Sequence, residues 1–124
     1  MPFTVRNVTK DKLLATEAAE ARSFGTRFIG LMGRRELPFG HGLHIVPCNG
    51  IHTFFMRIAI DSLFLDRELK VVKLFPSLPP WRATSVYFAT YSVLELPSGT
   101  VAASGTTEGD QLAVTANVQP PVKL

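Results

Sequence analysis

The feature that most constrains this chain is a continuous apolar stretch at residues 51–66, IHTFFMRIAIDSLFLD. Aromatic and β-branched side chains dominate it, and these suit a pleated sheet better than a helix. The stretch also contains a histidine, an arginine and two aspartates, which are costly to bury without hydrogen-bond partners. We therefore predict two core strands that meet at a bend near residues 57–61.

Most of the remaining chain consists of short segments with strand patterns, separated by turn residues. Helical spacing of apolar residues occurs between residues 18 and 35, where Ser23 is a suitable N-cap and Gly33 a suitable end. A second short helix is expected over residues 97–104, closed by Gly105. Further strands are expected at residues 3–8, 13–17, 43–46, 70–75, 85–91, 92–96 and 111–116.

Turn signals at intervals of about 8–12 residues are typical of a sandwich or a small barrel. The predicted fold class is mainly β: a compact sandwich or small barrel of short antiparallel strands with one or two short helices. The 124 residues suit one domain, which we place at residues 1–118. Residues 119–124 contain two prolines and are expected to form a loose C-terminal tail.

Composition excludes several classes of partner. The net charge is only +3 and the basic residues are scattered, so we expect no nucleic-acid binding. No apolar run approaches the roughly 20 residues that a membrane span needs, and residues 1–10 lack a signal-peptide core. The single cysteine, Cys48, rules out an intramolecular disulfide. We expect a soluble, cytoplasmic protein without a membrane partner.

The turn at residues 47–50 decides whether a metal site is plausible. His44, Cys48 and His52 have the spacing H-x3-C-x3-H, which is compatible with metal ligands. The Asn-Gly pair at residues 49–50 favours a two-residue hairpin loop, which would put the two histidines on opposite faces. Only a three-residue loop would bring them to one face. We therefore expect neither a metal nor a cofactor.

Two acidic residues lie inside apolar segments. Asp61 either accepts backbone N–H bonds and ties down the bend, or it is a pocket carboxylate with a shifted pKa. Glu95 lies between Leu94 and Leu96, so alternation places it on the face opposite those leucines. That face is either solvated or carries an ion pair with an arginine, or, as for Asp61, Glu95 is a pocket carboxylate with a shifted pKa.

Pro76, Pro79 and Pro80 bracket a loop that ends in Trp81 and Arg82. The prolines are expected to make this loop rigid. An aromatic face beside a guanidinium could bind sugars, carboxylates or a peptide. Alternatively, Trp81 covers the core and Arg82 pairs with Asp61 or Glu95.

Several short motifs occur together in a fixed order. Taken together, they make the chain similar to the DUF 192 family, a domain of unknown function, from about Thr16 to Val114. The resemblance implies a compact, mostly β domain, and it carries no established activity, cofactor or catalytic residue. The motifs are GLMGR at 30–34, GLHI at 42–45, FM at 55–56, ID at 60–61, FLD at 64–66, VLELPSG at 93–99 and GD at 109–110.

The leading functional hypothesis is a small binding module for a small polar or anionic ligand. Its candidate ligand-binding residues are Arg34, His52, Asp61, Trp81 and Arg82.

Two alternatives remain open. The first is a small hydrolase in which His52 is the base, Asp61 orients it, and Cys48 or a water attacks. The second is a protein-interaction domain that uses a sheet edge or the Trp81 loop.

Overall fold

The computed structural model describes residues 2–118, except for the side chains at positions 24, 28 and 29. The tail predicted at residues 119–124 lies outside the described residues. The described elements, in chain order, are β1 (Phe3–Asn7), β2 (Lys12–Ala21), α1 (Phe24–Ile29), β3 (Gly40–Ile45), β4 (Ile60–Leu65), β5 (Val71–Leu78), β6 (Ser92–Pro97), α2 (Thr100–Ser104) and β7 (Leu112–Ala116).

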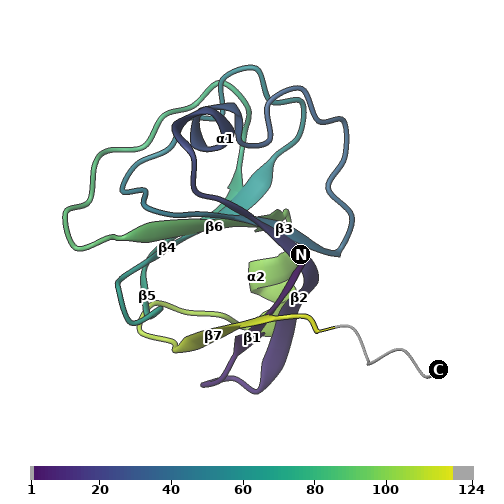
Figure 1. Ribbon diagram of the computed structural model, residues 1–124, viewed down its shortest axis with the longest axis vertical. Coiled ribbons are helices and arrows are strands. Elements are labelled where there is room, and N and C mark those ends of the chain that lie inside the picture. Colours follow the sequence, from purple (N-terminus) through teal and green to yellow (C-terminus); the bar gives the residue numbers. More distant parts are fainter. Residues whose placement is uncertain (1, 119–124) are drawn as a thin grey trace.

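All of these strands belong to one sheet, in the order β5-β4-β6-β3-β2-β1-β7. The sheet curls until its two edge strands approach each other (Figure 1). Backbone hydrogen bonds join the edges at the start of β5: the Val71 amide donates to Asp110 O at 2.9 Å, and the Gly109 amide donates to Val71 O at 2.7 Å. The result is a half-barrel, which confirms the predicted mainly β fold class.

One strand pair differs from the predicted antiparallel pattern. β2 and β3 are parallel, and the connection between them contains α1. Parallel neighbours need a crossover rather than a tight turn, and residues 22–39 supply it.

The concave side of the sheet holds the first of two apolar clusters. It includes α2, which lies within the curl of the sheet (Figure 1). Among the members of this barrel cluster are Val5, Leu14, Leu63, Leu65, Leu94, Leu96, Val101 and Leu112.

Asp61 of β4 ties this side together. Its side chain is completely buried, Oδ1 accepts a hydrogen bond from the Ser77 amide at 2.8 Å, and Oδ2 accepts one from the Val101 amide at 2.7 Å. The N-cap of α2 is Gly99, which has no side chain to cap the helix, so Asp61 supplies the capping oxygen from β4. These bonds match the first interpretation of Asp61, that of a backbone hydrogen-bond acceptor.

The convex side of β3, β6 and β4 is covered by α1 and by two long segments, residues 46–59 and 79–91 (Figure 1). Backbone hydrogen bonds join the two segments, among them Thr53 N to Arg82 O at 2.7 Å and Thr84 N to Ile51 O at 2.9 Å. Together they form an outer layer over a second apolar cluster. This outer cluster includes Leu31, Ile51, Met56, Ile60, Phe64 and Val93.

The predicted hairpin at residues 47–50 is wrong. Both edges of β3 are occupied, by β2 on one side and by β6 on the other, so no place remains beside it for residues 51–56. The chain therefore leaves the sheet after Ile45, and the Cys48 amide donates to Tyr91 O at 2.8 Å.

For the same reason, only part of the central apolar stretch is a strand. Ile60–Leu65 forms β4, whereas residues 51–59 belong to the outer layer. The prediction of a strand at 85–91 is also wrong, since that segment is in the outer layer too.

Both predicted helices are shorter than expected. Ser23 caps α1 as predicted, but the helix ends at Gly30 rather than Gly33. Pro97 stays in β6, paired with Ile60, so α2 begins only after Gly99.

Candidate functional site

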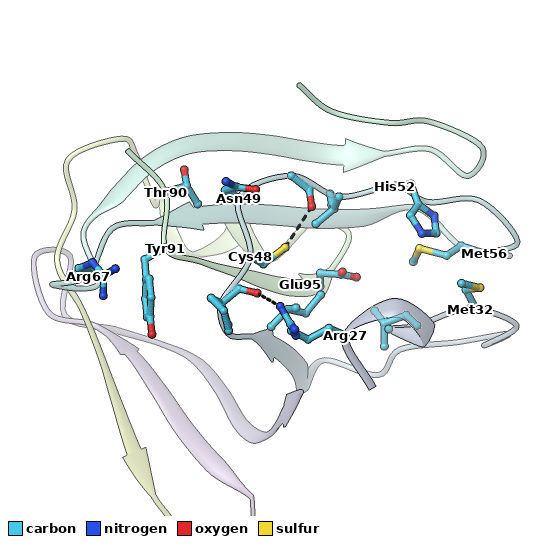
Figure 2. A pocket seen from close by; sticks show the side chains of 16 residues that line it. Arg27, Met32, Cys48, Asn49, His52, Met56, Arg67, Thr90, Tyr91 and Glu95 are labelled. Carbon is cyan, nitrogen blue, oxygen red and sulfur yellow. Dashed lines mark hydrogen bonds between the residues drawn. The ribbon is translucent and has the colours of Figure 1, made fainter. Parts of the chain in front are cut away.

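A cavity of about 690 Å³ lies between the convex side of β6 and the outer layer. Figure 2 shows it as an elongated space, with Arg67 and Tyr91 toward one end and His52 and Met56 toward the other. The lining residues that bear on its chemistry are Arg27, Cys48, His52, Arg67, Tyr91 and Glu95.

Glu95 is the buried acid of this cavity. Both neighbouring leucines of β6 belong to the barrel cluster, so strand alternation turns Glu95 to the convex side, as predicted. Its directly opposed residues are Leu43 on β3 and Ser62 on β4, neither of which is charged.

The Glu95 carboxyl lies in an apolar setting without a charged partner. The residue is 3% exposed, and its Oε2 atom has no hydrogen-bond partner among the residues that the structure describes. A Cβ placed at Gly30 would lie 4.0 Å from Glu95 Oε1, so the end of α1 closes over the carboxyl. Burial raises the pKa of Glu95 to about 8. The group is therefore mainly a neutral carboxylic acid at pH 7.

Two arginines give the cavity a positive charge. Arg27 is fixed on α1 by bonds from its Nη1 to Pro47 O at 3.0 Å and from its Nε to Ser23 O at 3.3 Å. The Arg67 guanidinium lies 4.2 Å from the centre of the Tyr91 ring.

No carboxylate of the described residues forms an ion pair with these arginines. Within residues 2–118, the ion pairs join Arg6 to Asp11, Lys10 to Asp110 and Arg22 to Glu20, all elsewhere in the molecule. The cavity walls therefore favour a negatively charged guest.

Cys48 is a poor nucleophile in this setting. Its thiol donates to Gly50 O at 3.2 Å. Burial raises the pKa of the thiol; Glu95 acts in the same direction, while the Gly50 bond and Arg27 act against it. The net result is an un-ionised thiol, which lacks the thiolate that attack requires.

His52 is the one predicted site residue that lines the cavity. Its Nδ1 accepts a hydrogen bond from the Phe54 amide at 3.2 Å, so in the neutral ring the proton is on Nε2. Asp61 faces the barrel side, opposite Leu96, and its oxygens bind the amides of Ser77 and Val101. The structure therefore does not bring His52 and Asp61 together as a base and its orienting carboxylate.

The other predicted residues lie outside the cavity. Trp81 is 56% exposed, and its ring centre lies 4.8 Å from that of Phe55. Arg82 and Arg34 are exposed, and Arg82 Nη1 makes a long bond of 3.4 Å to Pro80 O. The five predicted residues thus do not form one cleft.

The predicted absence of a metal can be compared with the positions of the three possible ligands. His44 is buried on the barrel side, opposite Leu94, and its Nε2 lies 2.9 Å from Ser92 Oγ. Burial lowers the pKa of His44. Cys48 and His52, by contrast, line the cavity on the other side of the sheet. Among the described residues, no three His, Cys, Asp or Glu side chains are grouped as metal ligands would be.

Sequence reasoning missed Arg27 and Arg67 and left Glu95 outside the predicted site. The available signal was a glutamate inside the apolar run VLEL, which alternation turns toward the face of Tyr91 and Val93. What the sequence does not show is that α1 and residues 46–59 cover that face.

The DUF192 family, described as "Uncharacterized ACR", matches residues 5–114. This chain belongs to the DUF192 family. It is 35% identical to a UPF0127 protein of Pyrococcus furiosus over 111 residues, which are 86% of this chain and 93% of the relative. A UPF0127 protein of Thermococcus kodakarensis is 31% identical over 115 residues, 88% of this chain and 71% of the relative. The match confirms the predicted family.

A crystal structure from Novosphingobium aromaticivorans has the same fold. That protein of unknown function superposes with a TM-score of 0.78 at 23% identity, over 91% of this chain and 84% of the other. At that identity the likeness bears on the DUF192 fold alone. None of these descriptions names a substrate or a ligand.

A search for membrane-spanning helices gives a negative result for the described residues: no helix there has the length and apolar character that a bilayer crossing requires.

Proposed function

We propose that this DUF192 domain is a binding module that takes a small polar or anionic molecule into the cavity above Glu95. The observation that supports this most is the Oε2 atom of Glu95, which is buried at the cavity wall without a hydrogen-bond partner in the described structure. A buried polar atom left unpaired costs about 1–3 kcal/mol. A ligand that hydrogen-bonds to the Glu95 carboxyl would recover part of that free energy.

The other lining groups support the same proposal. Thr90 Oγ1 is a second buried atom of the cavity without a hydrogen-bond partner in the described structure. Leu31, Ile51 and Met56 supply apolar walls. A mostly apolar cavity with a few polar groups is the usual composition of a small-molecule site.

The test is a thermal-shift screen against carboxylates, sugars and divalent metals, followed by NMR mapping of each hit. A ligand at about one hundred times its dissociation constant should raise the melting temperature by about 10 °C. Amide shifts should be concentrated at residues that line the cavity.

A variant that fills the cavity provides the control. Cys48→Trp should abolish the shift, while Phe88→Trp, at a position 93% exposed and outside the cavity, should preserve it. Binding that survives Cys48→Trp, or shifts that map to the Trp81 loop, would refute the proposal.

A second candidate function rests on an exposed group of aromatic rings, Phe54, Phe55 and Trp81. Their exposed fractions are 39%, 63% and 56%, and ring centres lie 4.8 Å apart for Phe55–Trp81 and 6.0 Å apart for Phe54–Trp81. Such a patch suits a protein partner. Trp81→Ala should then abolish capture of that partner and leave small-molecule binding in the cavity unchanged.

The hydrolase hypothesis receives no such support. It needs an ionised Cys48 thiol or a base oriented by Asp61. Burial raises the pKa of the Cys48 thiol, and the Asp61 oxygens bind the amides of Ser77 and Val101 on the barrel side.

A further inference from the structure

The charge of the cavity ligand can be inferred from the groups around Glu95. Those that titrate or carry charge are Arg27 on α1, Cys48 and His52 in the outer layer, Arg67 in the turn after β4, and Tyr91 before β6. The strands on either side of β6 place only Leu43 and Ser62 against Glu95. The charged residues that line the cavity with Glu95 in the described structure are therefore the two arginines, Arg27 and Arg67.

Glu95, Arg27 and Cys48 all line the cavity. Burial raises the pKa of the Cys48 thiol, Glu95 acts in the same direction, and Arg27 acts against it. Figure 2 shows the three side chains gathered in the middle of the cavity. A carboxyl, a guanidinium and a thiol thus line one cavity.

An amine ligand does not suit these surroundings. To pair with it, Glu95 would have to become a buried carboxylate, and the ammonium group would lie beside Arg27. Desolvation opposes the first change, and like-charge repulsion opposes the second.

A carboxylate ligand suits the same surroundings. The O–H of a neutral Glu95 can donate to a carboxylate oxygen, and the guanidinium of Arg27 supplies the opposite charge. The buried residues Leu31, Ile51 and Met56 line the same cavity and can cover a hydrocarbon remainder.

We propose that the cavity selects small monocarboxylates, whose carboxylate accepts a hydrogen bond from Glu95 beside Arg27 and whose apolar part lies against Leu31, Ile51 and Met56. This inference rests on the proposed binding function and specifies the ligand class.

The pKa of Glu95, raised to about 8, gives the inference a pH signature. Below that pH the carboxyl keeps the proton that it donates to the ligand. Above it, the site must take up a proton before a carboxylate can bind, so the affinity falls tenfold for each further pH unit. An amine would show the opposite trend, because it needs the ionised Glu95.

The experiment compares three probes with the same alkyl chain: hexanoate, hexylamine and hexanamide. Binding is followed by amide chemical shifts of the full chain between about pH 6.5 and about pH 9, a range in which hexanoate and hexylamine keep their charge. Hexanoate should bind at least about tenfold more tightly than either other probe at the lower pH, as expected for a charge-assisted hydrogen bond. Its affinity should fall about tenfold toward the upper pH.

Two variants sharpen the result. In Glu95→Gln the amide N–H still donates, so hexanoate should bind within about threefold of the original chain, and its pH dependence should disappear. Arg27→Gln should weaken hexanoate binding about tenfold, while the matched change Arg82→Gln, at an exposed arginine outside the cavity, should have no effect.

The outcomes separate the two proposals. Tighter binding of hexylamine or hexanamide at the cavity residues would overturn the carboxylate inference and leave the binding function intact. Hexanoate binding that does not change with pH would overturn the inference as well. If none of the three probes shifts the cavity residues, the carboxylate inference is overturned, and the proposed function is then decided by the wider screen against sugars and divalent metals.

Discussion

The two sides of the curled sheet bury their acidic groups in opposite ways. On the barrel side, Asp61 binds two backbone amides, and Asp110 accepts bonds from Asn7, Lys10 and Thr107. On the outer side, Glu95 is equally buried, but no group of residues 2–118 whose position is described donates to its Oε2. Neighbouring strands of one sheet therefore carry one acid that stabilises the fold and one that makes the fold less stable when it ionises.

We propose from this contrast that the barrel side is scaffold and that the outer side carries the binding site. A satisfied carboxylate lowers the free energy of the folded state, whereas an unpaired one raises it unless a ligand completes its hydrogen bonds. The predictions below test the contrast by changing one acid at a time.

The largest effect is expected at Asp61. Asp61→Asn replaces an acceptor oxygen by an NH2 group that faces a backbone N–H, so it should lower the free energy of unfolding by about 3 kcal/mol in urea melts. Asp11→Asn, at an exposed position, is the matched control and should cost less than about 0.5 kcal/mol. If Asp61→Asn lowers the free energy of unfolding no more than Asp11→Asn does, Asp61 does not stabilise the start of α2.

A smaller loss is expected at Asp110. Burial acts to raise the pKa of Asp110, but hydrogen bonds from Asn7, Thr107 and Lys10 outweigh it and hold that pKa below its ordinary value of 3.8. The folded state thus binds fewer protons than the unfolded state, and the stabilisation is present above about pH 4 and lost as the pH falls further. Asp110→Asn should cost about 2 kcal/mol at pH 7.

The dependence of the free energy of unfolding on pH in acid distinguishes the effect of the Asp110 charge from the packing of its side chain. Between pH 5 and pH 2, as rough limits, the original chain should lose stability more steeply than Asp110→Asn. Parallel curves for the two proteins would show that the Asp110 charge contributes nothing.

A gain of stability is expected at Glu95. Its pKa rises from 4.5 to about 8 on folding, so the folded state binds more protons in this interval, and stability should decrease as the pH rises through it. Glu95→Gln removes this loss, and it should be more stable than the original chain by about 4 kcal/mol near pH 8. Thermal melts at about pH 5 and pH 8 measure the difference. A variant that is less stable at the higher pH would contradict the contrast between the two sides.

The sequence predicts the fold class well because alternation and turn residues are local signals. The spacing of apolar residues indicates a small β domain, Ser23 is the N-cap of α1, and Gly105 closes α2. The isolated position of Asp61 in an apolar run also indicates a buried acid that needs a partner, and the bonds from Ser77 and Val101 match one of its two interpretations.

The site is less predictable, because its residues meet only through pairings that local pattern does not specify. The Asn-Gly pair indicates a hairpin, yet β3 already has neighbours on both edges and the segment crosses the convex face instead. That crossing covers Glu95 and brings Cys48 beside it, together with Arg27 from a helix about 70 residues earlier in the chain. No periodicity near Arg27 or Arg67 marks them as neighbours of Glu95.

The most direct test of the whole account is the ionisation of Glu95 itself. The side-chain carboxyl carbon of Glu95 can be followed by NMR during a pH titration of the full chain, with the Glu95→Gln variant identifying its signal. A midpoint at about 8 is the expected result. A midpoint at the ordinary value of 4.5 would show that Glu95 is solvated or paired, and the cavity would lose the group on which both proposals depend.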